Sequence, residues 1–234
     1  MNSDQIIKEL KALADPKKAQ HSKRFFKSGS GEYGEGDKFL GIKVPEQRKV
    51  AKKHRELSAD EIQKLLQSEY HEIRLTALFL MVYKVEKGGQ QELDEMTDLF
   101  LKNLEAVNSW DLVDSSAHQI LGRYLEDTDK DLLFDLARSN DLWKKRIAMI
   151  SCYHFIKQND FNDALAIAEI LVHDEHDLIQ KAVGWMLREI GNRDLATEES
   201  FLKKHYQNMP RTMLRYAIEK FEDPLSLKYL HGEV

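Results

Sequence analysis

Five related segments decide the fold of this chain. They are Arg74-Leu75-Thr76-Ala77-Leu78, Asp111-Leu112-Val113-Asp114-Ser115, Arg146-Ile147-Ala148-Met149-Ile150, Lys181-Ala182-Val183-Gly184-Trp185 and Arg215-Tyr216-Ala217-Ile218-Glu219. Their first residues are spaced by 37, 35, 35 and 34 positions. Each segment lies in a longer stretch of helical periodicity, and shorter helical stretches alternate with these. A period in the mid-thirties with two helices per unit is the signature of an α-solenoid, in which neighbouring helix pairs bury each other's apolar faces.

Helical periodicity continues along almost the whole chain, and no stretch alternates as a strand would. The expected helices cover 4–13, 16–27, 45–54, 58–68, 71–86, 91–105, 109–124, 128–139, 142–157, 161–172, 176–190, 197–207 and 210–221. Pro16 and Pro45 suit first helical turns, and Ser58-Ala59-Asp60-Glu61 has the pattern of a capping box. We therefore predict an all-α chain with one domain over 1–234. It comprises N-terminal helices over 1–57 with a glycine-rich loop at 28–44, helical-pair repeats over 58–223, and a tail over 224–234.

The composition is that of an ordered protein, with 42% hydrophobic and 32% charged residues. Cys152 is the only cysteine, which excludes an internal disulfide and a multi-thiolate metal site. A reducing cytoplasm is the simplest setting for such a chain. No apolar run approaches the length of a membrane span, and the start of the chain is not a signal peptide. We expect a cytoplasmic monomer that does not bind membranes.

The sequence predicts that charges segregate between the two kinds of helix. The net charge of −5 argues against a uniformly basic surface that coats nucleic acid, but it permits a local basic groove. Cations lie on the longer helices, and many acids lie on the shorter helices and turns. The cations are Arg74, Lys144, Lys145, Arg146, Lys181, Arg188, Arg211 and Arg215. Because equivalent helices of a solenoid line one concave surface, these residues predict a groove for a phosphate backbone. In the alternative interpretation, the arginines bridge adjacent repeats.

Trp110 and Asp114 are four residues apart and share one face of a predicted helix. An indole face attracts cations and a carboxylate neutralises them, so the pair suits a flat, positively charged guest. In the alternative interpretation, Trp110 is a core residue near a helix start capped by Asn108 or Ser109. Asp111 would then favour the helix dipole, but Asp114 would have no such explanation.

The repeat register places two further residues at nearly equivalent positions. Arg146 and Trp185 follow Trp110 in successive repeats, where equivalent side chains lie about 10 Å apart. Arg146 could grip a phosphate or form an ion pair between repeats. Trp185 could complete a cage or pack in the core. Gly184 is costly within a helix, so close approach of another helix or of a ligand would explain it.

Other motifs carry weaker signals. The glycine-rich run 29–37 lacks the Gly-Lys-Ser/Thr ending of a phosphate loop and contains three acids, so we expect a mobile loop that could act as a lid, docked by residues 38–45. The run 173–177 contains two histidines but no flanking ligands, and we predict no metal site there. Cys152 and His154 are two positions apart and point in different directions on a helix, so Cys152 is expected to be a buried, inert thiol.

Several stretches together resemble the AlkD-like DNA alkylation-repair glycosylases. They are Phe39-Leu40-Gly41-Ile42-Lys43-Val44-Pro45, Ser109-Trp110-Asp111-Leu112-Val113-Asp114, Trp143-Lys144-Lys145-Arg146-Ile147-Ala148 and Lys181-Ala182-Val183-Gly184-Trp185-Met186-Leu187-Arg188-Glu189. The resemblance covers about residues 15 to 225. It implies a superhelix of HEAT-like repeats and a lesion site lined by Trp110, Asp114 and Trp185. It also implies that Arg146 holds the DNA backbone beside that site.

The function implied by this resemblance is monofunctional N-glycosidic hydrolysis. The substrates would be cationic purines such as 3-methyladenine and 7-methylguanine in double-stranded DNA, released without metal, cofactor or deep base flipping. Asp114 would stabilise the sugar cation and position the attacking water. Two alternatives are a non-catalytic protein that binds branched or abasic DNA, and a protein-scaffolding solenoid without salt-dependent DNA affinity.

Overall fold

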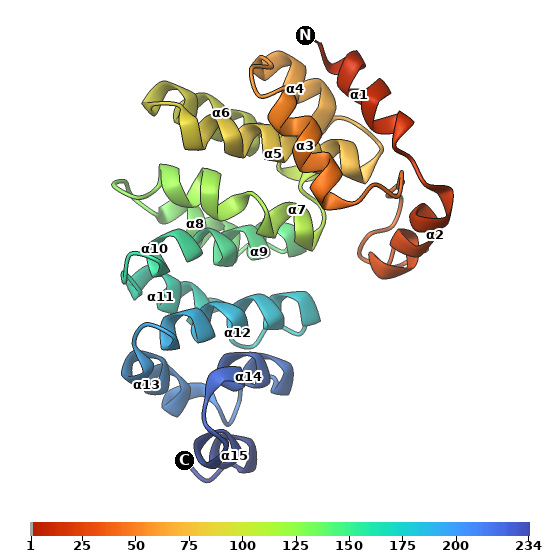
Figure 1. Ribbon diagram of the computed structural model, residues 1–234. Helices are drawn as coiled ribbons and strands as arrows, with labels where there is room; N and C mark the ends of the chain where they lie inside the picture. Colours follow the sequence, from red (N-terminus) through yellow and green to blue (C-terminus); the bar gives the residue numbers. More distant parts are fainter. Residues whose placement is uncertain (1) are drawn as a thin grey trace. The chain divides into compact units, whose positions relative to one another are not determined.

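The protein is described over residues 2–234 by a computed structural model made of helices joined by turns and loops (Figure 1). Met1 lies outside the described residues. Within residues 2–234 no strand forms, and Lys38 and Tyr70 make an isolated bridge. The prediction of an all-α chain is therefore confirmed. The helices group into two compact units, one ending at Tyr124 and the other beginning at Leu125, and each is described by itself.

The first unit is built around one fully covered helix. Its elements are α1 (Ser3–Ala12), α2 (Pro16–Phe25), α3 (Val44–Lys53), α4 (Ala59–Leu66), α5 (His71–Lys87), α6 (Gln90–Lys102), the 3-10 turn η1 (Leu104–Ala106), α7 (Trp110–Asp114) and the π-helical turn η2 (His118–Gly122). Every residue of α5 from 71 to 82 is buried. The helix packs against α3, α4, α6 and η2, as expected for a helix without a polar face.

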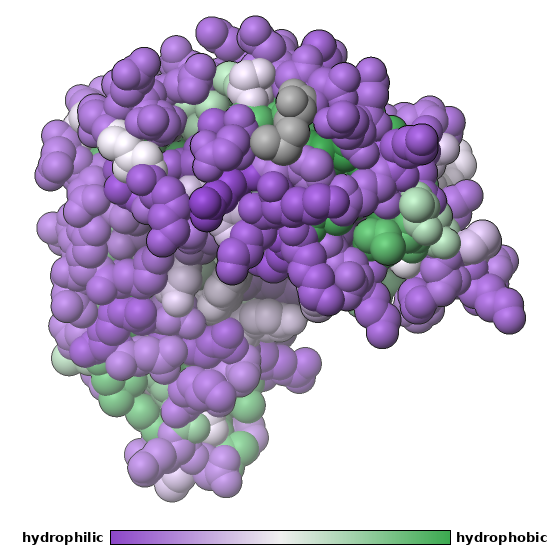
Figure 2. Space-filling view, turned by 45° about the horizontal axis from the view of Figure 1, so that its top comes forward, coloured by the Kyte–Doolittle hydropathy of each residue, from purple (hydrophilic) through white to green (hydrophobic). Residues whose placement is uncertain are grey.

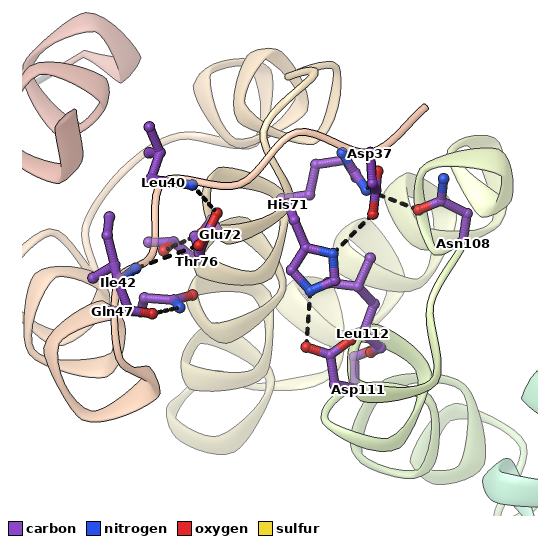
Figure 3. Close-up of polar contacts among 12 residues, drawn as sticks. Asp37, Leu40, Ile42, Gln47, His71, Glu72, Thr76, Asn108, Asp111 and Leu112 are labelled. Carbon is purple, nitrogen blue, oxygen red and sulfur yellow. Dashed lines mark hydrogen bonds and ion pairs between the residues drawn. The ribbon is translucent and has the colours of Figure 1, made fainter. Parts of the chain in front are cut away.

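The start of α5 anchors the segment that follows the glycine-rich loop. The buried Glu72 carboxylate accepts hydrogen bonds from the backbone amides of Leu40 (2.9 Å), Gly41 (2.7 Å) and Ile42 (3.3 Å) (Figure 3). Gly41 has a φ of +79°, and a Cβ atom there would lie 2.3 Å from the Asp15 carbonyl oxygen. Only glycine fits this junction between α2 and α5. The expectation that residues 38–45 dock the loop is thus confirmed.

The glycine-rich loop is tied at several points along its length. The Glu32 carboxylate accepts from the Gly29 amide at 2.8 Å, and the Glu35 carboxylate accepts from the Gly31 amide at 2.9 Å. The third acid, Asp37, binds side chains of α5. The three acids therefore have structural partners within the first unit.

The helix expected over 109–124 is interrupted. It consists of α7 followed by η2, with a turn at Ser115 and Ser116. The buried Ser116 hydroxyl donates to the Leu112 carbonyl at 2.6 Å. A serine that bonds back to the preceding turn disturbs a helix, which accounts for the short α7.

The second unit continues the pattern of paired helices. Its elements are α8 (Asp131–Ala137), α9 (Leu142–Ser151), α10 (Tyr153–Ile156), α11 (Asn162–Leu171), α12 (Asp177–Gly191), α13 (Leu195–His205), α14 (Arg211–Ala217), the 3-10 turn η3 (Ile218–Lys220) and α15 (Asp223–His231). Helix α12 packs against both α9 and α14. A Cβ atom on Gly184 would lie 2.5 Å from the Met213 carbonyl oxygen and from Tyr216 Cβ. Close approach of a helix, rather than of a ligand, explains this glycine.

Three sequence predictions fail in the second unit. The helix expected over 142–157 is divided into α9 and α10, and the one expected over 210–221 ends in η3. The tail expected over 224–234 contains α15, whose Tyr229 is fully buried. Pro224 stands in the first turn of α15 and Gly232 has a left-handed φ of 78° at its C-cap, which are ordinary helix boundary signals.

Hydrophilic side chains cover most of the described surface. The face drawn in Figure 2 is mostly hydrophilic, and hydrophobic residues appear on it only in separate small areas. Cys152 is completely buried, and its thiol lies 3.3 Å from the Ala148 carbonyl oxygen as a donor. Burial raises the pKa of this thiol far above its usual range. Among residues 2–234, none of the helices has both the length and the apolar character that crossing a membrane requires.

Candidate functional site

Helix α7 carries Trp110 and Asp114, the two residues that the sequence analysis predicts to form a site. Trp110 begins the helix and Asp114 ends it, one turn later, and both are partly exposed. Side chains four residues apart lie on the same helical face. Ser109 is the N-cap, but its side chain makes no capping hydrogen bond. The proposed capping role of Ser109 is therefore not seen.

An aromatic cluster surrounds Trp110 within the first unit. The Trp110 ring stacks on Phe26 at a centroid distance of 5.6 Å and meets Phe25 edge-on at 5.9 Å. Phe26 in turn stacks on Phe39 at 5.3 Å and lies 4.7 Å from the His71 ring. The core-packing interpretation thus accounts for part of the Trp110 ring, while the remainder stays exposed.

His71 lies beneath this cluster and joins two carboxylates. Its Nδ1 atom is 2.9 Å from Asp37 Oδ2, and its Nε2 atom is 2.8 Å from Asp111 Oδ2 (Figure 3). The His71 side chain is 2% exposed. Asp37 belongs to the glycine-rich loop, and Asp111 follows Trp110 on α7. His71 therefore connects the loop to the helix that carries Trp110 and Asp114.

The electrostatics of this network favour the imidazolium form of His71. Burial alone would lower the pKa of His71, but hydrogen bonds and charge from Asp111 and Asp37 raise it to about 9. Burial would likewise raise the pKa of Asp37, yet His71 and Arg74 lower it. At neutral pH the network consequently holds two cations and two carboxylates in ion pairs.

Arg74 completes the network and is not a surface residue. It is 4% exposed. Its guanidinium donates to Asp37 (2.6 Å), to the Asn108 side chain (2.8 Å) and to the Ala106 and Ser68 carbonyls (both 3.1 Å). The expectation that Arg74 contacts DNA is not supported by this placement, and the alternative of an arginine that bridges neighbouring helices describes it well.

Arg146 has a comparable position in the second unit. It is 5% exposed, and its guanidinium donates to the Leu178 carbonyl. This contact joins α9 to the start of α12. Its burial fits the bridging interpretation of Arg146, whereas phosphate binding stays a prediction.

Trp185 is half-buried on α12 of the second unit. Its Nε1 donates to Glu189 Oε1 at 3.2 Å, and its ring lies 5.8 Å from that of Tyr153. Part of the ring is exposed. A role for Trp185 in binding or catalysis remains a prediction.

The other predicted DNA-binding cations lie on α9, α12 and α14, and several have acidic partners. Lys145 pairs with Asp174 at 2.7 Å, Lys181 with Asp177 at 2.6 Å, and Arg188 with Glu219. Arg211 donates to the Leu230 carbonyl at 3.0 Å. Lys144 is half-buried and Arg215 is exposed. These pairings reduce the positive field that the sequence alone predicts for these helices.

The short run at 173–177 has structural roles. The Asp174 carboxylate accepts from Lys145 and, at 2.9 Å, from the His176 amide. The His176 ring accepts from the Leu178 amide at 3.2 Å and caps α12.

Sequence reasoning missed His71 and Asp37 and assigned Asp111 only to the helix dipole. No local pattern marks the trio, because 34 and 40 positions separate His71 from its two partners. The one available signal was an acidic residue that ends a glycine-rich loop.

Comparison with known proteins places this arrangement in a family. The chain matches the DNA alkylation repair enzyme family over residues 6–221. No curated protein sequence matches it.

Three solved structures are similar in fold. A predicted DNA alkylation repair enzyme from Enterococcus faecalis is 17% identical, with coverage of 90% of this chain and 98% of that chain and a TM-score of 0.69. The smu.31 protein of Streptococcus mutans UA159 is 18% identical, with 94% and 99% coverage and a TM-score of 0.52. AlkD2 from Streptococcus mutans is 18% identical, with 95% and 100% coverage and a TM-score of 0.53. The likeness confirms the predicted class of helical-repeat fold, and the chain belongs to the DNA alkylation repair enzyme family.

Proposed function

We propose that this protein is a monofunctional DNA glycosylase that hydrolyses the N-glycosidic bond of cationic alkylated purines in double-stranded DNA. The observation that carries the proposal is the placement of Trp110 and Asp114 on one face of α7, both partly exposed, in a member of a DNA alkylation repair family. Family membership supports alkylated DNA as the substrate, and the pair of side chains suits the chemistry of releasing a cationic base.

The reaction suits a site with an aromatic ring and a carboxylate. A purine alkylated at N3 or N7 already carries positive charge, so it leaves without prior protonation. As the bond breaks, positive charge develops on the sugar, and a nearby carboxylate stabilises it electrostatically. Asp114 would perform this role and orient the attacking water.

The aromatic residues would contribute attraction to the same developing charge. The exposed part of the Trp110 ring offers a π face to a cation, and its contacts with Phe25 and Phe26 fix the orientation of the ring. Trp185 is a second candidate for this attraction to the sugar cation, and its own substitution tests that role.

The test is release of bases from methylated duplex DNA, followed by chromatography of 7-methylguanine and 3-methyladenine. Wild-type protein should release both. Asp114→Asn should slow release by about 100-fold or more, the magnitude typical for loss of one electrostatic stabiliser, with DNA binding largely retained. Trp110→Ala and Trp185→Ala should each slow it by about tenfold.

Asp98→Asn is a matched control, because Asp98 is an exposed aspartate of α6. Its release rate should equal that of the wild type. A wild-type protein that releases no base, or an Asp114→Asn variant with undiminished rate, would exclude the proposed function.

A further inference from the structure

A cavity of about 400 Å³ lies at the C-terminal end of the second unit. Residues from the end of α12, the start of α13, η3 and the start of α15 line it, and these helices are labelled in Figure 1. All of them belong to the second unit. A volume of this size is in the range of sites that bind small molecules.

Part of the lining is apolar. It is formed by Leu195, Phe221, Pro224 and Leu225, and Leu195 is 46% exposed although it is a large hydrophobic residue. Covering apolar surface in a concave site is favourable, because the surface is removed from water. The cavity therefore suits a ligand with an apolar body.

The buried polar group of the lining is the carboxyl group of Glu198, on α13. Glu198 lines the cavity but is only 1% exposed, and its Oε1 atom has no hydrogen-bond partner within residues 2–234. Gly191 of α12 leaves the space that the carboxyl group occupies, since a Cβ atom there would overlap Glu198 Oε2. A buried polar atom without a partner opposes folding. A ligand that bonds to Glu198 would remove that cost.

The other charged groups at the cavity balance one another. Arg188 and Lys220 line it, and both lie near the Glu219 carboxylate, Arg188 in an ion pair and Lys220 at 3.8 Å. Glu222 adds an exposed acid to the lining. Burial raises the pKa of Glu198 to about 8, so this group is uncharged at neutral pH. Two cations thus face two carboxylates, and the described groups give no net charge that would attract an ion.

An uncharged carboxyl group offers a donor beside an acceptor. Its O–H donates and its carbonyl oxygen accepts, so it can pair through two hydrogen bonds with an amide edge, in which a C=O lies beside an N–H. We infer that this cavity binds a small, uncharged molecule with an apolar body and an amide or lactam edge, which pairs with Glu198. The inference is independent of the proposed glycosylase function.

The experiment titrates the full chain with benzamide and follows the backbone amide signals by heteronuclear NMR. Benzamidine and benzoate have nearly the same shape but carry a positive and a negative charge, so they are matched probes. At pH 7 benzamide should bind with a dissociation constant of about 1 mM or lower and shift the signals of Gly191, Asn192 and Phe221. The two charged probes should bind about tenfold or more weakly, because each would have to bury its charge.

Two substitutions of Glu198 separate hydrogen bonding from titration. Glu198→Met removes the hydrogen-bonding edge and should weaken benzamide binding about tenfold or more. Glu198→Gln keeps a donor beside an acceptor, so it should still bind benzamide, with an affinity that is constant between about pH 6 and 10. Glu175→Gln is the control, because Glu175 is an exposed acid of the same unit, and it should bind like the wild type. Thermal unfolding verifies that each variant is folded.

In the wild type, benzamide binding should weaken as the pH rises through about 8, because the Glu198 carboxylate no longer donates. The other groups that face Glu198 are Arg188 of α12, Glu199 of α13 and Tyr229 of α15, besides Lys220 and Glu222 of the lining. Burial raises the pKa of Tyr229 to about 12, so Tyr229 keeps its proton over this range.

Tighter binding of benzamidine or benzoate than of benzamide would overturn the inference. So would undiminished benzamide binding by Glu198→Met, or the absence of signal shifts with all three probes at about 10 mM. If Glu198→Met does not fold, the pH series of the wild type and Glu198→Gln decides, and the same pH dependence in both proteins would exclude pairing with Glu198.

Discussion

His71 and Asp111 are joined by a 2.8 Å contact between Nε2 and Oδ2, which connects the first turn of α5 to the residue after Trp110. The opposite ring nitrogen contacts Asp37, so a single buried imidazolium holds α7 and the glycine-rich loop together. The orientation of the candidate catalytic helix thus depends on an ion-pair network that lies under it.

Replacing His71 should destabilise the first unit. His71→Gln leaves Asp37 and Asp111 without their shared cation, and loss of one partner from a buried ion pair costs about 3–5 kcal/mol. Urea unfolding of His71→Gln, Asp111→Asn and the double variant should give a coupling energy of about 1–3 kcal/mol. The exposed His173→Gln is the control and should unfold like the wild type. Strict additivity of the two substitutions would show that the contact carries no energy.

The same network predicts a dependence of stability on pH. The pKa of His71 is about 9 in the folded protein against 6.5 ordinarily. The stabilisation from its proton is fully present below pH 6.5 and is lost as the pH rises to about 9. That contribution amounts to about 3 kcal/mol. Asp37, whose pKa is lowered, acts in the opposite sense, and its contribution is lost in acid. The difference in unfolding free energy between the wild type and His71→Gln should therefore decrease between pH 7 and 10. A constant difference would contradict an ionised His71.

Glu198 should reduce stability at neutral and alkaline pH. Burial raises its pKa to about 8, which Arg188 partly opposes, and its Oε1 atom is buried without a hydrogen-bond partner. Unfolded protein ionises this group above its ordinary pKa of 4.5, whereas folded protein keeps the proton until about pH 8. Stability is thus lost between these values, by up to about 1.4 kcal/mol per pH unit. Glu198→Gln should unfold at a higher temperature than the wild type at pH 8. The difference between the two unfolding temperatures should decrease toward pH 5. Glu222→Gln is the control, because Glu222 is exposed. A difference in unfolding temperature between Glu198→Gln and the wild type that does not change with pH would refute a raised pKa of Glu198.

Gly184 should tolerate no side chain. A Cβ atom would clash with α14 at 2.5 Å from both the Met213 carbonyl oxygen and Tyr216 Cβ, so Gly184→Ala should destabilise by about 1–3 kcal/mol despite the better helix propensity of alanine. Gly89→Ala is the matched control, because its nearest neighbour would be 3.9 Å away. Thermal unfolding of the two variants should differ by several degrees. Equal unfolding temperatures of the two variants would mean that α14 can move away from α12.

The repeat register predicted the fold because the same residue types recur where helices contact. Arg74 and Arg146 begin two of the repeated segments, and both are buried with donors directed at backbone of another element. Periodicity therefore located two buried arginines that donate to backbone carbonyls, and the sequence alone did not reveal their burial. The short helices were mispredicted where a side chain competes with the helix backbone, as Ser116 does after α7.

The site was predictable only in part. Trp110 and Asp114 are neighbours on one helix, so local spacing is enough to pair them. The His71 network depends on contacts between distant segments, which no local pattern reports.

The burial of Cys152 protects its thiol from reaction with electrophiles. Alkylating electrophiles that damage DNA also attack thiolates, and reactivity at cysteine depends on the thiolate form and on access. The only cysteine of this chain is wholly enclosed, bonded to the Ala148 carbonyl, and has a strongly raised pKa. The protein therefore exposes no cysteine nucleophile to alkylating electrophiles.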